Sequence, residues 1–280
     1  MIKMGYQGVP GANSEEATLS FYSDLGSERV LDAIGYQSFG SLIQDLVTRQ
    51  LDYAVIPVEN STTGLITRTL DLLRDIPVVA VSELYQPIQH VLWGTAEASL
   101  DTIDTVYSHP EALSQCSQFL DSHTGWSQIA YADTAEAAKF IKMENNPALA
   151  AVASGRAGNL YGLTPLAREF QNEQHNTTRF FLMEHYQTIQ DLSGNRLVLY
   201  IETLHEAGSL LDLLEVFDLF KINLESLNSQ PIPKKPFAYG FYVEIDLATL
   251  EGEFDLLWQM VEHVSENIHI IGQFESTSTR

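Results

Sequence analysis

DYAVIPVENSTTGLI, residues 52–66, contains an apolar run that stops abruptly at a polar block. Residues 52–58 predict a buried strand, because apolar residues follow one another there with little polar alternation. Residues 59–63 predict a polar turn, and residues 64–74 predict a helix after that turn. A turn that directly follows a strand lies at the strand's carboxyl end, where open α/β sheets bind their ligands.

The segments before residue 52 repeat the order of strand and helix. Residues 2–6 predict a strand, and a glycine-rich loop leads from it to a helix whose N-cap we expect at Asn13 or Ser14. Residues 30–36 predict a second strand, and residues 41–49 an amphipathic helix. This alternation predicts an α/β fold with a parallel sheet.

The same order of elements repeats from residue 78 onward. Strands are predicted at 78–85, 88–94, 104–108 and 127–132, and helices at 110–120 and 134–143. These elements form a second α/β lobe, and the chain returns to the first lobe through the apolar stretch at 177–185. Two lobes joined by crossing strands predict a cleft between them.

The last part of the chain has a different pattern. After residue 195 the predicted elements are a strand, a helix, two strands, a helix and a strand, the last of them in IHIIGQF. This βαββαβ order, over about 85 residues, predicts a ferredoxin-like unit.

Composition narrows the functional classes. The chain has 280 residues, 45% of them hydrophobic, which suffices for a large core and allows two domains. The formal charge of −22 is spread along the sequence, which makes nucleic acid a poor partner. No run approaches the ~18 apolar residues of a membrane span, and no signal peptide opens the chain, so we expect a cytoplasmic protein.

Metal and disulfide chemistry are not expected. The one cysteine, Cys116, excludes an intramolecular disulfide, and the eight histidines show no zinc-ligand spacing. An anionic ligand would be repelled by the overall charge, so its binding would need local donors such as helix N-termini, hydroxyls and the few arginines.

Several segments offer such donors. The turn at 59–63 has five consecutive polar residues, more than one helix cap requires. The loop YQGVPGANS, residues 6–14, lacks the G-x-G-x-x-G spacing of a dinucleotide site and is either a plain glycine turn or an anion nest. In SHPEALSQC, residues 108–116, Ser108 or His109 caps a helix, Gln115 is the expected ligand contact, and Cys116 is a small core residue.

The stretch HNTTRFF, residues 175–181, begins the strand that returns to the first lobe. Strand alternation puts Thr178 and Phe180 on one face, and Arg179 and Phe181 on the other. Thr178 is either a ligand contact or bonded to a neighbouring backbone, and Arg179 is either a ligand contact or half of an ion pair.

Together these segments resemble the prephenate dehydratase family over essentially the entire chain. The resemblance rests on YQGVPGANS, DYAVIPVENSTTG, SHPEALSQC, YGL at 161–163 and NTTRFF, in the family's order. It implies two periplasmic-binding-protein-like α/β lobes around a cleft, followed by a ferredoxin-like ACT domain. The implied catalytic domain covers 1–190, with lobe one at about 1–76 and 155–190 and lobe two at about 77–154, and the ACT domain covers 195–280. No chorismate mutase segment precedes Met1, so a monofunctional enzyme is expected.

The resemblance also implies an activity: prephenate loses water and carbon dioxide and becomes phenylpyruvate, without any cofactor. The family's catalytic threonine matches Thr178, as a donor to the leaving hydroxyl, and Glu59 is the alternative proton source. The implied substrate contacts are Ala12, Asn13, Ser14, Asn60, Ser61, Ser108, Gln115, Arg179 and Phe180. Arogenate dehydratase remains an alternative, as does a two-lobed amino-acid or solute sensor without catalysis.

The regulatory half departs from the family pattern. The implied effector is L-phenylalanine, with contacts at Gly208, Ser209, Leu210, Asn223 and Leu224. NSQP at 228–231 replaces the usual E-S-R-P, so weak, altered and absent inhibition all stay open. Pairing of ACT units predicts a homodimer or homotetramer. The family often has Gln at position 111, where this chain has Glu111, which we expect to face solvent.

Overall fold

The computed structural model describes residues 1–74, 76–186, 192–232, 235 and 238–277. Its residues pack as two compact units. Unit one consists of Met1–Thr69 and Leu84–Phe180, and unit two consists of Leu70–Glu83 and the residues from Phe181 onward. The predicted domain boundary at 190–195 falls partly on residues 187–191, which lie outside the described residues. The domain boundaries therefore stay a prediction.

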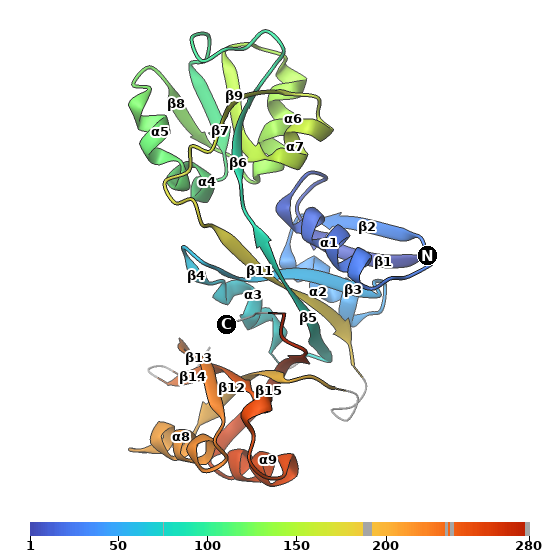
Figure 1. Ribbon diagram of the computed structural model, residues 1–280, viewed down its shortest axis with the longest axis vertical. Coiled ribbons are helices and arrows are strands. Elements are labelled where there is room, and N and C mark those ends of the chain that lie inside the picture. Colours follow the sequence, from blue (N-terminus) through green and yellow to red (C-terminus); the bar gives the residue numbers. More distant parts are fainter. Residues whose placement is uncertain (75, 187–191, 233–234, 236–237, 278–280) are drawn as a thin grey trace. The chain divides into compact units, whose positions relative to one another are not determined.

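The first sheet of unit one is built around a parallel core. Its strands run in the order β11-β3-β1-β2, with β4 on β3. Their bounds are β1 Ile2–Gln7, β2 Leu31–Tyr36, β3 Tyr53–Asn60, β4 Gly64–Leu65 and β11 Thr177–His185, of which the last continues into unit two. Strand β1 pairs in parallel with both β2 and β3, which confirms the predicted parallel pairing. Helices α1 (Asn13–Asp24) and α2 (Phe39–Val47) connect these strands (Figure 1).

The predicted helix at 64–74 is wrong in its first half. Gly64 has a φ of +79°, outside the helical region, and it pairs with Asn60 in a short hairpin with β3. Helical structure then appears only as α3 (Thr67–Leu70) and a short 3₁₀ turn (Asp71–Leu73). The backbone of this hairpin bends the segment back over β3, because Ile66 N donates to Val58 O.

The second sheet of unit one has the order β10-β6-β9-β7-β8. Its strands are β6 His90–Gly94, β7 Thr105–Ser108, β8 Ser127–Ala130, β9 Leu149–Ser154 and β10 Thr164–Arg168. Helices α4 (Pro110–Gln115), α5 (Ser117–Ser122), α6 (Thr134–Glu144) and α7 (Gly155–Leu160) accompany it (Figure 1). Small residues let α6 and α7 approach the buried Trp93, and an added Cβ at Gly158 would lie 2.0 Å from its ring.

Residues 110–120 were predicted as one helix but form two. Cys116 has φ −115° and ψ 11°, so the α-helical path breaks there and restarts at Ser117. Its side chain is fully buried in a core cluster with Leu113 and Leu120. Burial of this small side chain, as predicted from its position, accompanies the bend.

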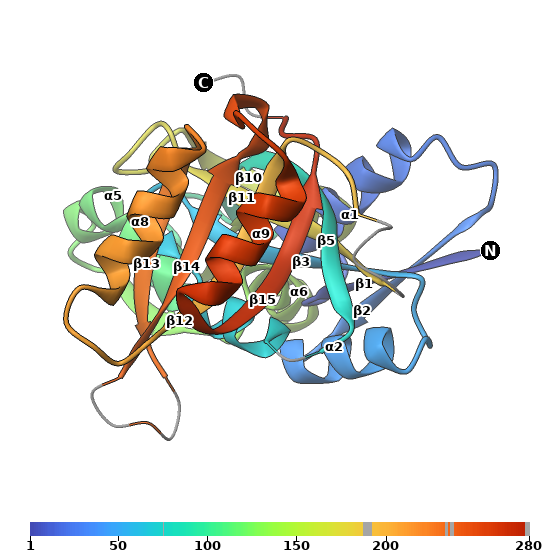
Figure 2. The same cartoon turned by 90° about the horizontal axis from the view of Figure 1, so that it is seen from below.

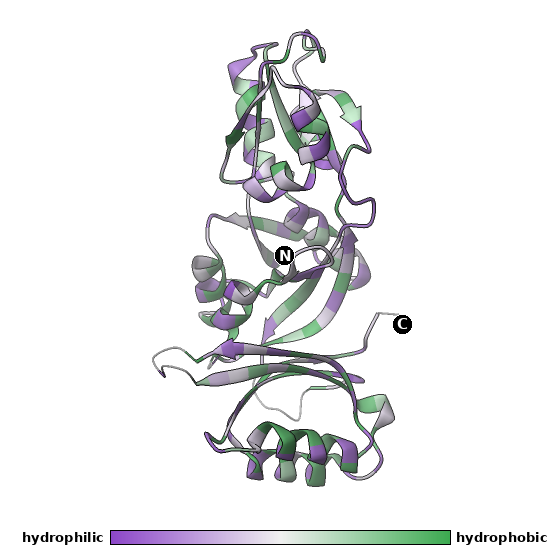
Figure 3. Cartoon of the chain, turned by 90° about the vertical axis from the view of Figure 1, so that its left-hand side faces the viewer, coloured by the Kyte–Doolittle hydropathy of each residue, from purple (hydrophilic) through white to green (hydrophobic). Residues whose placement is uncertain are grey.

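Unit two contains the predicted βαββαβ order. The elements are β12 Arg196–Thr203, α8 Ser209–Leu219, β13 Asn223–Pro231, β14 Tyr239–Asp246, α9 Phe254–His263 and β15 Ser265–Phe274, with a 3₁₀ turn at Leu247–Thr249. The sheet order is β13-β14-β12-β15, and β5 (Val78–Pro87) pairs in parallel with β15. Figure 2 shows α8 and α9 side by side on one face of this sheet. Both helices carry apolar and polar residues (Figure 3), as expected for helices with one packed face.

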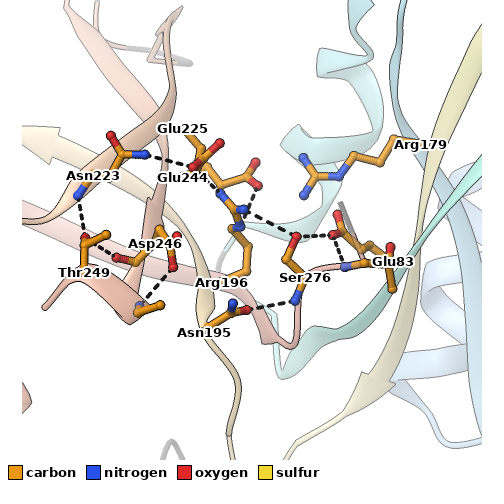
Figure 4. Close-up of polar contacts among 12 residues, drawn as sticks. Glu83, Arg179, Asn195, Arg196, Asn223, Glu225, Glu244, Asp246, Thr249 and Ser276 are labelled. Carbon is orange, nitrogen blue, oxygen red and sulfur yellow. Dashed lines mark hydrogen bonds and ion pairs between the residues drawn. The ribbon is translucent and has the colours of Figure 1, made fainter. Parts of the chain in front are cut away.

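A buried arginine links the strands of unit two. Arg196 lies on β12. Its Nη1 is 3.2 Å from Oε1 of Glu225 on β13, and its Nε is 3.6 Å from Oε1 of Glu244 on β14 (Figure 4). Its Nη2 also donates to Ser276 Oγ, which in turn donates to Glu83. The two carboxylates supply the pairing that a buried guanidinium needs, so this cluster is structural. Within the described residues, no helix has the length and apolar character that a bilayer crossing requires.

Candidate functional site

A cavity of about 480 Å³ lies in unit one and is lined by residues from both sheets and their helices. The first sheet contributes the ends of β1, β3 and β11, and the second contributes His90 of β6 and the start of α4. Of the predicted residues, Ala12, Asn13, Ser14, Asn60, Gln115, Thr178 and Phe180 line it. The cavity therefore brings together residues from distant parts of the sequence.

The first turns of α1, α2, α4 and α6 all reach this cavity. Ser38 caps α2 by accepting from Ser41 N, and Asp133 caps α6 by accepting from two backbone amides. Helix α1 has no side-chain cap, and its N-cap is Ala12 rather than the predicted Asn13 or Ser14. Ala12 N donates to Val9 O at 3.0 Å, so among the described residues the amides of Asn13 and Ser14 are the ones that remain available to an anion, at the positive end of the helix dipole.

Asn60 is the centre of a hydrogen-bonded cluster at the cavity wall. Its Oδ1 accepts from the backbone N–H groups of Thr62 and Thr63, at 3.0 and 3.2 Å. Backbone N–H groups can only donate, so they fix the orientation of the amide. The Asn60 Nδ2 group consequently faces away from the turn and donates to Asn176 Oδ1 at 2.7 Å and to Thr178 Oγ1 at 3.0 Å.

The direction of that last bond determines what Thr178 can do. Because Thr178 Oγ1 accepts from Asn60, its own proton is free to be donated elsewhere. No acceptor for this proton appears among the described residues, and Thr178 lines the cavity while being only 9% exposed. The hydroxyl proton is thus available to an acceptor in the cavity.

Gln115 extends the cluster onto the second lobe. Its Oε1 accepts from Asn176 Nδ2 at 3.0 Å, and its Nε2 donates to Glu111 Oε1 at 3.3 Å. Asn60, Asn176 and Gln115 therefore form a continuous amide chain that lines one side of the cavity. Sequence analysis identified Asn60 and Gln115 but not Asn176.

The charges in the lining are few. Arg68 is the one Lys or Arg side chain among the described residues that line the cavity, and its guanidinium carbon lies 5.4 Å from the centre of the Phe39 ring. Two carboxyl groups, those of Glu111 and Asp133, also line the cavity. Burial raises the pKa of Asp133 above its ordinary value. The hydrogen bonds that its carboxylate accepts from the backbone N–H groups of Glu136 and Ala135 lower the pKa and partly offset this rise. Glu111 was expected to face solvent, and the residue is exposed yet lines the cavity.

Glu59 and Arg179 do not line the cavity. They alternate with Asn60 and Thr178 along their strands and so point to other faces. Their side chains pair with each other instead, with Arg179 Nη1 3.8 Å from Glu59 Oε2. Arg179 also lies over the Tyr85 ring at 5.6 Å. This arrangement gives Glu59 no direct path to a ligand in the cavity.

Ser61 and Ser108 also lie outside the lining. Ser108 is fully buried and donates to Val152 O at 2.6 Å, which ties β7 to β9. Ser61 Oγ accepts from Thr177 N at 2.9 Å and so fastens the turn to β11. Both hydroxyls hold backbone segments that carry other cavity residues.

Two other kinds of chemistry would need a reactive thiol or a metal site. Burial raises the pKa of Cys116 to about 12, so its thiol stays protonated and is a poor nucleophile. Among the residues that the structure describes, no group of three or more His, Cys, Asp or Glu side chains could hold a metal ion.

The five predicted effector residues lie in unit two, and three of them line the same cavity. Gly208, Ser209 and Leu210 line a cavity of about 270 Å³ with Tyr239 and Phe241. Asn223 and Leu224 are not part of that lining. The Asn223 side chain donates to Glu225, and its backbone N donates to Thr249 (Figure 4).

Sequence analysis missed Arg68, His90, Asp133 and Asn176, which all line the main cavity. The expected helix at 64–74 hid Arg68, since a residue in a regular helix has no special reason to face a site. Asn176 directly precedes the predicted TTRFF strand, and its position next to Thr178 was a usable signal. His90 stands in an apolar strand, where a core histidine is the ordinary expectation.

The fold and this cavity define a two-sheet α/β protein whose main cavity is lined by amides, hydroxyls and helix N-termini. A family model described as prephenate dehydratase matches residues 4–188. The chain belongs to the prephenate dehydratase family, whose members are lyases of phenylalanine biosynthesis.

Individual relatives extend this finding. The bifunctional chorismate mutase/prephenate dehydratase of Escherichia coli (strain K12) is 29% identical over 276 residues, covering 98% of this chain and 71% of the relative. The chloroplastic arogenate dehydratase/prephenate dehydratase 2 of Arabidopsis thaliana is 31% identical over 288 residues, covering 99% and 74%. The crystal structure of an Arthrobacter aurescens prephenate dehydratase in complex with L-Phe has a TM-score of 0.85 at 20% identity, covers 100% of this chain and 92% of that chain, and supports the fold.

Proposed function

We propose that the protein converts prephenate to phenylpyruvate by decarboxylating dehydration, with Thr178 as the donor to the departing hydroxyl. The observation that carries the proposal is the orientation of Asn60, which leaves the Thr178 proton directed at the cavity. Threonine is a very weak acid, so we assign it a hydrogen bond that strengthens as charge builds on the leaving oxygen. The aromatic product supplies the driving force. Glu59, the alternative proton source, has no comparable geometric support.

A direct assay tests this function. Purified protein is mixed with prephenate, and the absorbance of phenylpyruvate is followed. Turnover supports the proposal, and binding without turnover would support the alternative of a two-lobed sensor. Two periplasmic-binding-protein-like lobes would suit an enzyme as well as a sensor without catalysis, so only a measurement of turnover separates the two functions.

We assign the substrate carboxylates to the first turn of α1 and to Arg68. The uncapped amides of Asn13 and Ser14 offer neutral donors at a positive dipole end, which suits an anion despite the overall charge of −22. Arg68 adds a guanidinium, which binds carboxylates through two parallel N–H groups.

Arg68→Gln should therefore weaken binding more than catalysis. We expect KM to rise about 10- to 100-fold, from the loss of a charged hydrogen bond, with a smaller change in kcat. Steady-state kinetics measures both values. Lys139→Gln, at an exposed position on α6, removes the same charge away from the cavity and should leave KM unchanged. Equal KM values in the two variants would contradict the assignment of Arg68.

Glu111 favours arogenate as a second candidate substrate. Prephenate carries two carboxylates and a ketone, whereas arogenate carries an ammonium group in place of the ketone. A carboxylate in the lining, with no ion-pair partner among the described residues, attracts an ammonium and repels a second carboxylate. The matching relatives include an arogenate dehydratase/prephenate dehydratase.

Glu111→Gln should shift the preference toward prephenate. The ratio of kcat/KM for arogenate to that for prephenate should fall about fivefold, as expected for a partly solvated charge. Glu144→Gln, at the exposed end of α6, gives the same charge change outside the lining and serves as the control. An unchanged ratio in Glu111→Gln would show that this carboxylate does not meet the side chain of the substrate.

We further propose that residues 195–280 are an ACT regulatory domain. The βαββαβ order, the cavity at Gly208–Leu210 and the L-Phe bound by the Arthrobacter aurescens relative support this assignment. Calorimetry with L-phenylalanine tests effector binding, and absence of heat would leave the domain without this effector. Pairing of these domains predicts at least a dimer, which light scattering measures.

A further inference from the structure

His90 is the least exposed titratable side chain in the lining of the main cavity. It is the first residue of β6 and is 4% exposed, and its backbone N donates to Gln171 Oε1 at 2.8 Å. Its ring Nε2 lies 3.0 Å from Gln115 Oε1, whereas its Nδ1 has no hydrogen-bond partner among the described residues. One ring nitrogen is thus engaged with the amide chain and the other is not.

The hydrogen bonds determine which nitrogen carries the proton. Burial lowers the pKa of His90 below its ordinary value of 6.5, so the ring is neutral at pH 7 and has a single N–H. Gln115 Oε1 is an acceptor, because it also receives the N–H of Asn176 Nδ2. A proton on Nε2 satisfies that contact, whereas a proton on Nδ1 would leave the buried N–H without an acceptor among the described residues.

We propose that His90 is a positioning residue, whose Nε2–H group holds the Gln115 carbonyl and thereby the amide chain that ends at the Thr178 hydroxyl. The chain is fixed at one end by the backbone of Thr62 and Thr63, which orient Asn60, and at the other end by His90. If Gln115 rotated its amide, two N–H groups would face each other at Asn176, and Asn176 would lose the orientation in which it accepts from Asn60.

The same contact determines what Gln115 presents to the cavity. With its oxygen held by His90 and Asn176, its Nε2 group donates its two N–H bonds to Thr62 Oγ1 and to Glu111 Oε1, a carboxylate of the cavity lining. His90 therefore acts on substrate through Gln115 rather than by contact with the reacting atoms. The proposal rests on the proposed function, because it concerns the same cavity.

Two variants of one residue test the proposal. His90→Leu fills space but removes the donor, and His90→Gln restores an N–H at about the distance of Nε2. We expect His90→Leu to lower kcat about tenfold with KM within about twofold, and His90→Gln to recover most of that loss. His123→Leu, a part-buried histidine outside the cavity, controls for the general effect of this replacement and should keep the wild-type kcat. Equal kcat losses in the two His90 variants, or none in His90→Leu, would overturn the proposal.

A spectroscopic measurement separates this proposal from the proposed function. Long-range proton–nitrogen NMR spectra of the full chain should show the neutral Nε2–H form of His90. The Gln115 side-chain amide signals, assigned by their absence in Gln115→Glu, should shift in His90→Leu and return toward wild type in His90→Gln. If the wild-type protein turns over neither prephenate nor arogenate, the proposed function fails while these spectra still decide the role of His90. A His90 ring protonated at Nδ1, or Gln115 amide signals that stay unchanged in both variants, would refute the positioning role of His90.

Discussion

Thr178→Val is expected to lower kcat for prephenate about 10²- to 10³-fold, the cost of removing one preorganised donor to a developing negative charge. Valine has nearly the shape of threonine, so packing on β11 next to Phe180 should survive. The loss therefore reports the hydroxyl rather than the fold. Phenylpyruvate formation measures the effect, and circular dichroism checks that the variant is folded.

Two companion variants sharpen the result. Thr178→Ser keeps the hydroxyl and should retain much of the activity. Thr177→Val makes the same change one residue earlier, on the other face of the strand and outside the lining, and should have kcat near the wild-type value. Should Thr178→Val and Thr177→Val behave alike, the Thr178 hydroxyl is not the donor.

Asn60→Asp is expected to cause a loss of similar size, about 10²- to 10³-fold in kcat, for a different reason. The variant keeps the shape and the acceptor that binds the backbone of Thr62 and Thr63. It replaces the donor toward Thr178 with a second acceptor, which would take the Thr178 proton for itself. The hydrogen bond reverses, and the substrate loses its donor.

The control for Asn60→Asp needs the same change of charge. Asn159→Asp supplies it at an exposed position on α7, outside the cavity. We expect the wild-type kcat for this variant. An active Asn60→Asp enzyme would contradict the direction assigned to the Asn60–Thr178 bond and, with it, the proposed role of Thr178.

Much of the fold could be predicted from local patterns. Apolar runs located the strands, and the alternation of strand and helix indicated the parallel pairing that β1 makes with β2 and β3. The turn chemistry around Gly64 was misjudged, because its hairpin with Asn60 depends on a backbone conformation that the residue type permits but does not require. The break at Cys116 could not be predicted either, because no glycine or proline marks the end of the first helix there.

The site was predictable only where a strand end or helix start identified it. Asn60 ends β3, Thr178 lies at the start of β11, and Gln115 ends the short helix α4, which begins directly after β7; all three line the cavity. The bond between Asn60 and Asn176 joins residues 116 apart in sequence, so no local pattern contains it. For the same reason the engagement of His90 with Gln115 became visible only in three dimensions.

The uncapped start of α1 has a consequence for how this protein should be studied. Its donors at the cavity belong to the main chain, so alanine substitutions at Asn13 and Ser14 would leave them in place and show no effect of their loss. Replacing single backbone amides with esters, by semisynthesis, would remove these N–H donors one at a time and so reveal their contribution to binding. Sequence drift at Asn13 is tolerable by the same logic, whereas Gly11 is constrained by its φ of +98° and by an added Cβ lying 2.9 Å from the Ala157 backbone.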